Sequence, residues 1–336
     1  MSKTKKIALI GGAGFIGHNL ALSLKAQGHM PIIIDNLSVN NILSFANIET
    51  KDRKLYWSIL NKRLELLHKN KIDVNIEDAR NYNAVSMILN DYSPDIIIHL
   101  AAVSHANKSN KDPHTTFDHS LRTLENVLDI CNNMGSRFIY FSSSMVYGNF
   151  LDSSVTEDTQ CNPIGIYGAL KYSGELIIKA YHRVFDLPYT IIRPSALYGN
   201  RCVSRRVGQI FIENAIQGLD INIQGDGTSM LDFTYINDLT DGLGLVIDNP
   251  KAINETFNLT YGEARSVRAM LEILQEHFDG LKINYIDKDL LLPERGTLNI
   301  DKARNLIGYK PNYSLDIGYP KYIKWYKKFW ETISNY

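Results

Sequence analysis

Short apolar runs alternate with amphipathic segments over the first part of the chain. The apolar runs have the length and residue types of buried strands, and they lie at residues 5–11, 30–35, 96–103, 137–143 and 187–199. Between them, apolar residues recur at helical spacing in segments 19–29, 116–135 and 167–185. Strands that alternate with helices in this way indicate βαβ units. We therefore predict an α/β fold with a parallel, doubly wound sheet.

Two regions depart from this alternation. Residues 38–72 are polar and contain one segment of helical spacing, RKLYWSILNKRLELLHKN. From about residue 200 onward, shorter elements are separated by the turn-forming segments GDGTS, DNP and LLPERG. We interpret residues 1–195 as the sheet domain and residues 196–336 as a smaller, mixed α/β lobe that binds substrate. Some segments of this lobe are expected to return to the first domain.

Charge and cysteine content narrow the class of protein. The 36 basic residues equal the 36 acidic ones, so net charge gives no general attraction for nucleic acid or a membrane surface. The three cysteines are widely spaced and form neither a metal-binding pattern nor a disulfide framework. Because no apolar run reaches the roughly 18 residues of a membrane-spanning helix, we expect a cytoplasmic protein without a metal site.

The C-terminal segment, YPKYIKWYKKFWETISNY, mixes aromatic and basic residues. Ile323, Tyr326, Trp330 and Ile333 recur at helical spacing, with lysines between them. Such a helix either lies on a membrane surface or packs its apolar stripe against the domain. We expect the packed helix.

A glycine-rich turn follows the first apolar run. Gly11, Gly14 and Gly17 have the spacing GxxGxxG and stand between a predicted strand and a predicted helix. Such glycines allow a tight turn, a close backbone approach to a pyrophosphate and close packing of the helix, whose N-terminus favours negative charge. The second strand ends in Asp35, whose carboxylate can accept hydrogen bonds from an adenosine ribose and would repel a 2′-phosphate. The combination predicts a Rossmann-type site for NAD rather than NADP.

Two further motifs contain candidate catalytic residues. The segment YGALK places Tyr167 and Lys171 four residues apart, on one face of a helix. A free phenol, with a pKa of about 10, is a poor base at neutral pH, and a nearby ammonium group favours its ionised form. Such a tyrosine can take a proton from an alcohol while NAD takes the hydride. The largely apolar segment RFIYF at 137–141 is followed by three serines, which either form a strand-end turn or belong to the same site.

The chain resembles the extended short-chain dehydrogenase/reductase family, and within it the nucleotide-sugar epimerases and dehydratases. The resemblance covers nearly the whole chain and is carried by the glycine turn, FSSS, YGALK, RPSALYG and GDGTSMLDFTYINDL. In that family the catalytic hydroxyl lies four residues before the tyrosine of VYG. This implies Ser143 as the group that orients the substrate alcohol, Tyr167 as the base and Lys171 as its partner. It also implies cofactor contacts from Gly11, Gly14, Phe15, Ile16, Gly17, Asp35, Asn36, Asp78, Ala79, Leu100, Ala101, Ala102, Ser120, Tyr167, Lys171, Pro194 and Ser195.

The chain departs from two branches of this family. The 4,6-dehydratases carry Asp-Glu after the catalytic residue, where this chain has Ser144 and Met145. A thioether cannot act as a general acid or base, so dehydration is disfavoured. The UDP-hexose epimerases carry a diphosphate-binding arginine where this chain has Leu231, and an asparagine where it has Ala196. The nucleotide end of the substrate is therefore expected to be held differently.

Other arginines could replace the missing one. Arg295 matches the family's late diphosphate arginine, while Arg201, Arg205 and Arg206 either supply a substitute or form a solvated basic loop. The substrate contacts that we expect are Ser143, Met145, Arg205 and Arg295.

These departures favour a GDP-linked sugar over a UDP-hexose. The chain as a whole is similar to bacterial enzymes of surface-polysaccharide pathways that act on GDP-manno-heptose. We expect NAD-dependent oxidation of a nucleotide-sugar hydroxyl at C4 to a ketone. A UDP-hexose-type 4-epimerase shares this first step and is the alternative. A non-catalytic NAD-binding sensor is the remote alternative, because such proteins typically lose part of the Ser–Tyr–Lys set.

An oligomer is also expected. The helical segments 115–134 and 167–185 carry apolar residues on more than one side. In the family that the chain resembles, the corresponding pair forms a four-helix interface between subunits. We therefore expect a homodimer or a dimer-based oligomer.

Overall fold

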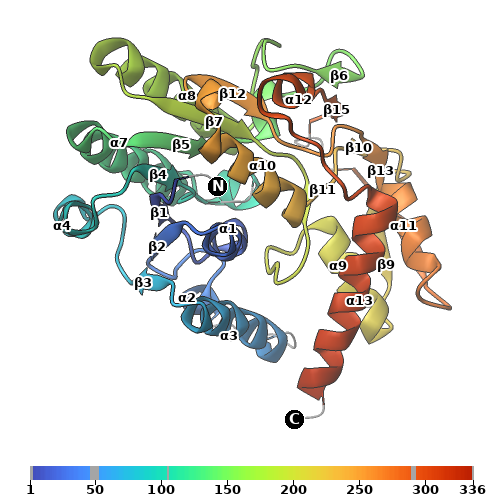
Figure 1. The fold of residues 1–336 in the computed structure, drawn as a ribbon. Helices are drawn as coiled ribbons and strands as arrows, with labels where there is room; N and C mark the ends of the chain where they lie inside the picture. The colour runs from blue at the N-terminus through green and yellow to red at the C-terminus, as the bar shows by residue number, and fades with distance from the viewer. Residues whose placement is uncertain (1–2, 46–52, 104–105, 289–292, 335–336) are drawn as a thin grey trace.

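A seven-stranded parallel sheet forms the centre of the molecule (Figure 1). The computed structural model describes residues 3–45, 53–103, 106–288 and 293–334. The strand order is β12-β7-β5-β4-β1-β2-β3, and neighbouring strands pair in parallel. The predicted α/β fold with a doubly wound sheet is thus confirmed. The strands are β1 (Lys6–Ile10), β2 (Met30–Ile34), β3 (Asp73–Asn75), β4 (Ile96–His99), β5 (Arg137–Phe141), β7 (Tyr189–Arg193) and β12 (Glu255–Asn258).

Side chains of these strands alternate between two apolar layers, because successive residues of a strand point to opposite faces. Ile7 and Leu9 of β1 belong to one cluster of buried residues, and Ala8 and Ile10 belong to the other. Both faces of the sheet are covered, which explains the nearly continuous apolar runs. The first cluster includes residues of α1 (Phe15–Ala26), α3 (Arg53–Lys69) and α10 (Ile236–Asp248). The second includes residues of α4 (Tyr82–Tyr92), α7 (Thr123–Met134) and α8 (Ile166–Phe185).

The polar insertion after β2 contains two helices. A short α2 (Ile42–Phe45) is followed by the long α3, so the helical spacing expected at residues 53–70 is confirmed. Helix α3 contacts α1 at the sheet and also contacts the C-terminal helix α13 (Leu315–Ser334) (Figure 1). The insertion therefore joins the beginning of the chain to its end.

The second half of the chain supplies the smaller lobe. Strand β9 (Ile221–Gln224) pairs in parallel with β14 (Ile283–Ile286), and β10 (Met230–Leu231) pairs antiparallel with β13 (Arg265–Ser266). Helices α9 (Val207–Gln217), α11 (Val267–Gln275) and α13 pack together beside these strands. Helix α10 and strand β12 lie in or against the central sheet, and α12 (Asp301–Ile307) contacts β12. A division at residue 195 stays a prediction.

Two small parallel pairs join distant parts of the chain. Strand β8 (Leu197–Tyr198) pairs with β11 (Thr234–Tyr235), and β6 (Ser154–Val155) pairs with β15 (Thr297–Leu298). Single turns of helix lie at η2 (Ser144–Tyr147) and η3 (Pro250–Ala252).

The segment expected as one helix at 116–135 has an irregular start. After α5 (Ala106–Lys111) and α6 (Pro113–Phe117), the backbone forms a π-helical turn, η1 (Asp118–Arg122), before α7 begins. A π turn contains one residue more than an α turn and changes the direction in which its side chains point.

The C-terminal helix packs against the domain, as expected. Ile323 and Tyr326 of α13 are fully buried, together with Tyr319 and Tyr322. Within the described residues, no helix is long and apolar enough to cross a lipid bilayer.

Candidate active site

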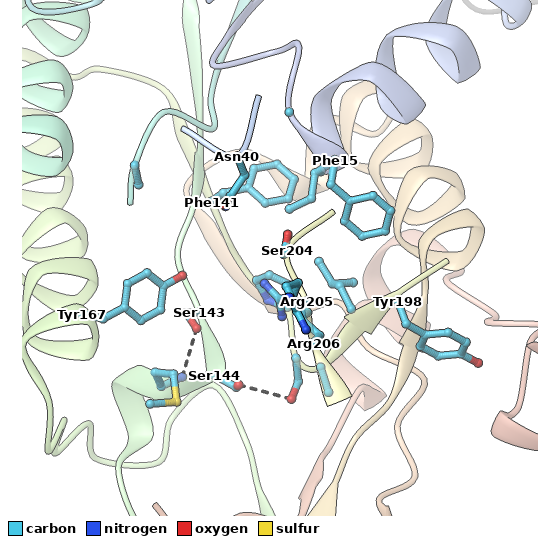
Figure 2. A pocket seen from close by; sticks show the side chains of 18 of the residues that line it. Phe15, Asn40, Phe141, Ser143, Ser144, Tyr167, Tyr198, Ser204, Arg205 and Arg206 are labelled. Atoms are coloured by element: carbon cyan, nitrogen blue, oxygen red, sulfur yellow. Dashed lines mark hydrogen bonds between the residues drawn. The ribbon is translucent and has the colours of Figure 1, made fainter. Parts of the chain in front are cut away.

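One long cavity opens at the carboxyl ends of the parallel strands, where ligands bind in open α/β sheets. Its lining runs from the glycine turn at Gly11, past the end of β5, to the smaller lobe at Arg295. Residues from both halves of the chain therefore face one space (Figure 2).

The glycine turn forms one end of this cavity. Gly11 has a φ of 77°, and a Cβ atom there would lie 2.7 Å from the backbone nitrogen of Ala101. A Cβ on Gly17 would overlap the backbone of Gly12, so this glycine lets α1 pack close to the turn. Gly14 immediately precedes α1 and lines the cavity. This geometry agrees with the roles predicted for the glycines, namely a tight turn, a close approach of backbone and close packing of the helix.

Asp35 lies at the end of β2 and also lines the cavity. Its two carboxylate oxygens accept backbone N–H groups of Ala13 at 2.9 Å and of Leu37 at 2.7 Å. Burial raises the pKa of Asp35, while these hydrogen bonds and the charge of Arg63 act in the opposite direction. Each oxygen keeps a further lone pair, so the carboxylate can still accept ribose hydroxyls.

The wall beside Asp35 is built from polar contacts. Asn36 donates to Asp78 at 2.8 Å, and Arg80 donates to the same carboxylate and to Asp118. Hydrogen bonds from Arg80 hold the pKa of Asp78 well below its usual range. Asn126 on α7 holds the backbone oxygen of Ala79 at 3.0 Å. The predicted cofactor residues here, Asn36, Asp78 and Ala79, all line the cavity.

The predicted catalytic set comes together at the centre of the cavity. Figure 2 shows the ring of Tyr167, from α8, with its hydroxyl turned towards Ser143 at the start of η2. Burial raises the pKa of Tyr167, while the charge of Arg206 and a hydrogen bond with Ser143 lower it. Ser143 also accepts the backbone N–H of Met145 at 3.2 Å, which fixes the direction of its side chain. Such a pair can bind a substrate hydroxyl and take its proton.

Lys171 lies one helical turn beyond Tyr167. Its ammonium group donates to the backbone oxygen of Phe141 at 2.6 Å and stands 4.9 Å from the ring centre of Tyr140. Burial lowers the pKa of Lys171 to about 7, and the carboxylate of Glu175 opposes this shift. The ammonium keeps two further donors, which suits the predicted role of holding a cofactor ribose.

The serines on either side of Ser143 have different partners. The hydroxyl of Ser142 donates to Glu175, which also forms a buried ion pair with Arg193 at 2.6 Å. Ser144 donates to Ser195 at 3.2 Å and accepts from Arg295 at 3.3 Å. Ser142 therefore anchors the end of β5 to α8 and β7, while Ser144 lies on the substrate side. Both side chains form hydrogen bonds with segments that lie far away in the sequence.

Arg206 is one of the three arginines that the sequence offered as a substitute for the missing one, although only Arg205 was expected to contact the substrate. It immediately precedes α9 and lines the cavity, and its side chain lies beside those of Arg205 and Ser204 (Figure 2). Its Nε atom is buried and, among the described residues, has no hydrogen-bond partner. Burial and the nearby charge of Arg206 lower the pKa of Arg295 to about 10. Two guanidinium groups thus line one cavity, and that of Arg295 contacts Ser144, an arrangement suited to an anion.

Other candidate residues divide into those that line the cavity and those that do not. Arg205 and Leu231 line it, whereas Arg201 binds α1 outside the lining. Ser120 is buried and is not part of the lining, while His119 and Thr123 are. The remaining predicted cofactor and substrate residues in the lining are Phe15, Ile16, Leu100, Ala101, Ala102, Met145, Pro194, Ser195 and Arg295.

The sequence of residues 7–260 matches the family described as the NAD dependent epimerase/dehydratase family. The chain belongs to this family. The predicted resemblance to nucleotide-sugar epimerases and dehydratases is therefore confirmed, and NAD is the cofactor. The glycine turn and Asp35 fit that cofactor by their geometry.

Members of the family resemble the chain over almost its whole length. A protein of Bacillus subtilis (strain 168) named as a UDP-glucose epimerase, YtcB, is 29% identical over 93% of this chain and 95% of its own. Protein CapI of Staphylococcus aureus is 26% identical over 97% of this chain and 99% of its own. The solved UDP-glucuronic acid 4-epimerase of Bacillus cereus, in complex with UDP-glucuronic acid and NAD, is 26% identical and has a TM-score of 0.85. That structure covers 96% of this chain and 99% of its own.

Within this family, the cavity divides into two functional halves. The half from the glycine turn to Ser143, Tyr167 and Lys171 contains the residues predicted to bind NAD and to react. The half from Ser144 to the smaller lobe contains Arg206 and Arg295 among its cationic groups. This arrangement is that of an NAD-dependent enzyme acting on nucleotide sugars.

Proposed function

We propose that the protein is a 4-epimerase that inverts the C4 hydroxyl of a UDP-linked sugar. Its relatives support this proposal, since they include proteins named as UDP-glucose and UDP-glucuronate 4-epimerases. These relatives favour the epimerase alternative over oxidation of a GDP-linked heptose. Protein CapI is a further relative, and its name is in keeping with polysaccharide synthesis.

The observation that carries the proposal is the position of Arg206. The expectation of a GDP-linked sugar was based on Leu231, which removes an arginine from the diphosphate site. Arg206 stands just before α9, 25 residues before Leu231, and brings a guanidinium to the cavity that Arg295 also lines. Charge-assisted hydrogen bonds from two such groups can hold a diphosphate, so Leu231 no longer argues against UDP.

The side chains around the reacting carbon have separate roles. Ser143 orients the C4 hydroxyl, and Tyr167 takes its proton. Lys171 supplies positive charge that favours the ionised phenol. Bound NAD provides the hydride acceptor for the oxidation of C4 to a ketone. Turning of the ketone in the cavity, followed by return of the hydride to its other face and of the proton from Tyr167, gives the inverted alcohol.

Dehydration is not part of the proposal. Ser144 and Met145 occupy the positions that hold Asp-Glu in the 4,6-dehydratases, and both line the cavity. Ser144 is held by Ser195 and Arg295, and a thioether has no proton to give. Elimination of water across C5 and C6 would need a general acid and a base at these two positions.

Product analysis tests the proposal directly. The purified holoenzyme is incubated with UDP-glucose, UDP-glucuronic acid, UDP-N-acetylglucosamine and GDP-mannose, and the sugars are identified by proton NMR. We expect at least one UDP-sugar to reach an equilibrium mixture of C4 epimers, without build-up of NADH absorbance. A stable keto sugar formed with an equal amount of NADH would contradict the epimerase and restore the dehydrogenase.

A further inference from the structure

Arg63 on helix α3 is a charged residue far from the reacting groups, and it is only 1% exposed. Its Nε and Nη2 atoms donate to the backbone oxygen of Arg201 at 3.0 and 2.5 Å. Its Nη1 atom donates to the backbone oxygen of Asn40 at 3.5 Å. Burying a guanidinium group is costly unless its hydrogen bonds are satisfied. Here they are satisfied by two loops that lie far apart in the sequence.

Arg201 continues the chain of contacts towards the glycine turn. Its Nε atom donates to His18 Nε2 at 2.8 Å, and its Nη2 atom donates to Asn19. Because Nε2 accepts this hydrogen bond, His18 is neutral and its Nδ1–H donates to the backbone oxygen of Gly14, 2.8 Å away. Burial and the charges of Arg63 and Arg201 keep the pKa of His18 well below its usual range, in agreement with this neutral form.

These contacts join three segments around the cavity. The glycine turn and the loop that follows β2, with Asp35 and Asn40, line the half that binds NAD. The loop 199–206 leads from β8 to Arg205 and Arg206 in the other half. Arg201 adopts a φ of 66°, a left-handed conformation that needs support from its surroundings. Arg63 supplies that support through the carbonyl oxygen of the same residue.

We propose that Arg63 is a positioning residue that couples the two halves of the cavity, by holding loop 199–206 against the segments that bind NAD. This inference rests on the proposed function in one respect, namely that Arg206 faces the substrate diphosphate. Occupation of either half then favours the same position of the loop, so each ligand strengthens binding of the other. Loss of the guanidinium frees the loop from Asn40 and α3, and Arg206 loses its fixed place.

The test measures release of NAD from the holoenzyme. Released NAD is trapped as fluorescent NADH by an added alcohol dehydrogenase with ethanol, in the absence and presence of saturating UDP. In the wild type we expect UDP to slow the release. Arg63→Gln should speed release about 10-fold, as expected for lost hydrogen bonds to a charged group, and should abolish most of the UDP effect. Lys62→Gln, which changes the exposed neighbour paired with Glu65, should behave as the wild type.

A second variant keeps the test decisive if Arg63→Gln does not fold. Arg201→Met removes the bonds to His18 and Asn19 but leaves the carbonyl oxygen that Arg63 binds. It should also reduce the UDP effect, and the two changes together should have less than the sum of their separate effects. In steady-state assays, both variants should raise KM for the nucleotide sugar more than they lower kcat.

Unchanged NAD release with an unchanged UDP effect in both variants would overturn the inference. So would a loss of thermal stability alone, because a merely structural residue would not alter the ratio of release rates. Failure of the proposed function gives a different result. The wild type would then leave every UDP-sugar unchanged, while the trapping assay would still report the coupling, with GDP as a second probe.

Discussion

Ser142, Ser143 and Ser144 follow one another at the end of β5, and their hydroxyls point to three parts of the molecule. Ser142 lies on the side of the Glu175–Arg193 ion pair, and Ser143 lies on the side of Tyr167. Ser144 faces Ser195 and Arg295. One short segment thus connects the buried support of the sheet, the proton transfer and the substrate side. The sequence spacing identifies Ser143, but the partners of Ser142 and Ser144 lie 33 to 151 residues away along the chain.

Replacing Tyr167 with Phe tests the assignment of the base. The ring and its packing stay, and only the proton acceptor is lost. We expect kcat to fall by about 100- to 10,000-fold, the usual range for a general base, while the NAD content of the purified protein stays at the wild-type level. Steady-state assays and cofactor analysis by chromatography measure the two quantities. A variant with near wild-type turnover would show that another group takes the proton.

Arg206 and Arg205 offer a matched pair for the substrate side. Arg206→Met removes a guanidinium that lies near both Arg295 and Tyr167. We expect kcat/KM to fall by about 10- to 100-fold, the equivalent of one or more charge-assisted hydrogen bonds. The loss of a positive charge also raises the pKa of Tyr167, so the acidic limb of the pH–rate profile should move to higher pH.

Arg205→Met is the comparison for this variant. Arg205 is exposed although it lines the cavity, so we expect a smaller fall in kcat/KM and no shift of the acidic limb. A larger effect of Arg205→Met than of Arg206→Met would return the diphosphate contact to Arg205, the residue that the sequence comparison favoured.

The pKa of Lys171 predicts a pH dependence of stability in the protein without NAD. Burial lowers this pKa to about 7, whereas an unfolded chain has an ordinary lysine pKa of about 10.4. Between these values the unfolded state binds more protons, so stability contributed by Lys171 rises with pH across this window. Urea unfolding at about pH 7 and about pH 9 should show a stability of the wild type, relative to Lys171→Met, that increases with pH. An equal difference at both pH values would contradict this assignment.

At the scale of elements, Glu213 is the point where three helices meet. It belongs to α9 and is 1% exposed. Its carboxylate accepts hydrogen bonds from Tyr56 of α3 at 2.8 Å, from Gln209 of α9 at 2.7 Å and from Tyr326 of α13. Burial raises the pKa of Glu213, and these three donors oppose the shift. The polar insertion after β2 is thereby joined to both ends of the smaller lobe.

Removal of this carboxylate should destabilise the whole molecule. Glu213→Ala leaves two buried hydroxyls and one amide without their acceptor, at a cost of about 1–3 kcal/mol for each unsatisfied group, with partial relief by rearrangement. We expect the free energy of unfolding to fall by about 2–4 kcal/mol. Urea denaturation measures this, with Glu331→Ala on the exposed side of α13 as the control. Equal stabilities of the two variants would show that the three helices do not depend on Glu213.

The π turn η1 shows where element prediction from sequence ends. A regular helix over residues 116–135 is what the apolar spacing predicts, and the family comparison then places Ser120 at the cofactor. In the structure this segment begins with a π turn, and His119 and Thr123 line the cavity whereas Ser120 does not. The hydroxyl of Thr123 donates to the backbone oxygen of His119 at 2.9 Å. The residue types in this segment do not predict a π turn. Which side chains line the cavity is therefore known only from the three-dimensional structure.

At the scale of the whole molecule, the central sheet was predictable from the sequence. The contacts between segments that lie far apart along the chain were not. Apolar runs such as KIALI and IIIH identify buried strands, because both faces of a parallel sheet are covered. The pairing of β12 with β7 and the approach of Arg206 to Arg295 bring together residues that lie about 60 to 90 positions apart. Local periodicity and motif spacing contain no information about such distances. For this reason the sequence alone, with Leu231 in place of an arginine, favoured a GDP-linked sugar: the position of Arg206 in the cavity could not be predicted.

The quaternary structure stays a prediction, which the surface of α8 allows us to sharpen. Leu176, Val184 and Phe185 of this helix are 51%, 69% and 54% exposed, and Phe117 at the end of α6 is 54% exposed. Apolar side chains gathered on neighbouring helices suit an interface between subunits. We expect a dimer by light scattering at micromolar concentration, and a monomer for Leu176→Glu. Glu276→Gln, directly after α11 of the smaller lobe, serves as the control. A monomeric wild type would contradict the expectation.

Asp35 has a consequence for attempts to change the cofactor of this enzyme. Its carboxylate accepts the backbone N–H groups of Ala13 and Leu37, so it shapes the glycine turn and the loop after β2 besides lining the cavity. The usual engineering change, which replaces such an acidic residue with a small or basic one to admit a 2′-phosphate, would also remove both supports. A preference for NADP therefore requires a redesigned turn as well as a new charge. Directed evolution towards NADP should have to supply new acceptors for the backbone N–H groups of residues 13 and 37 when residue 35 is changed.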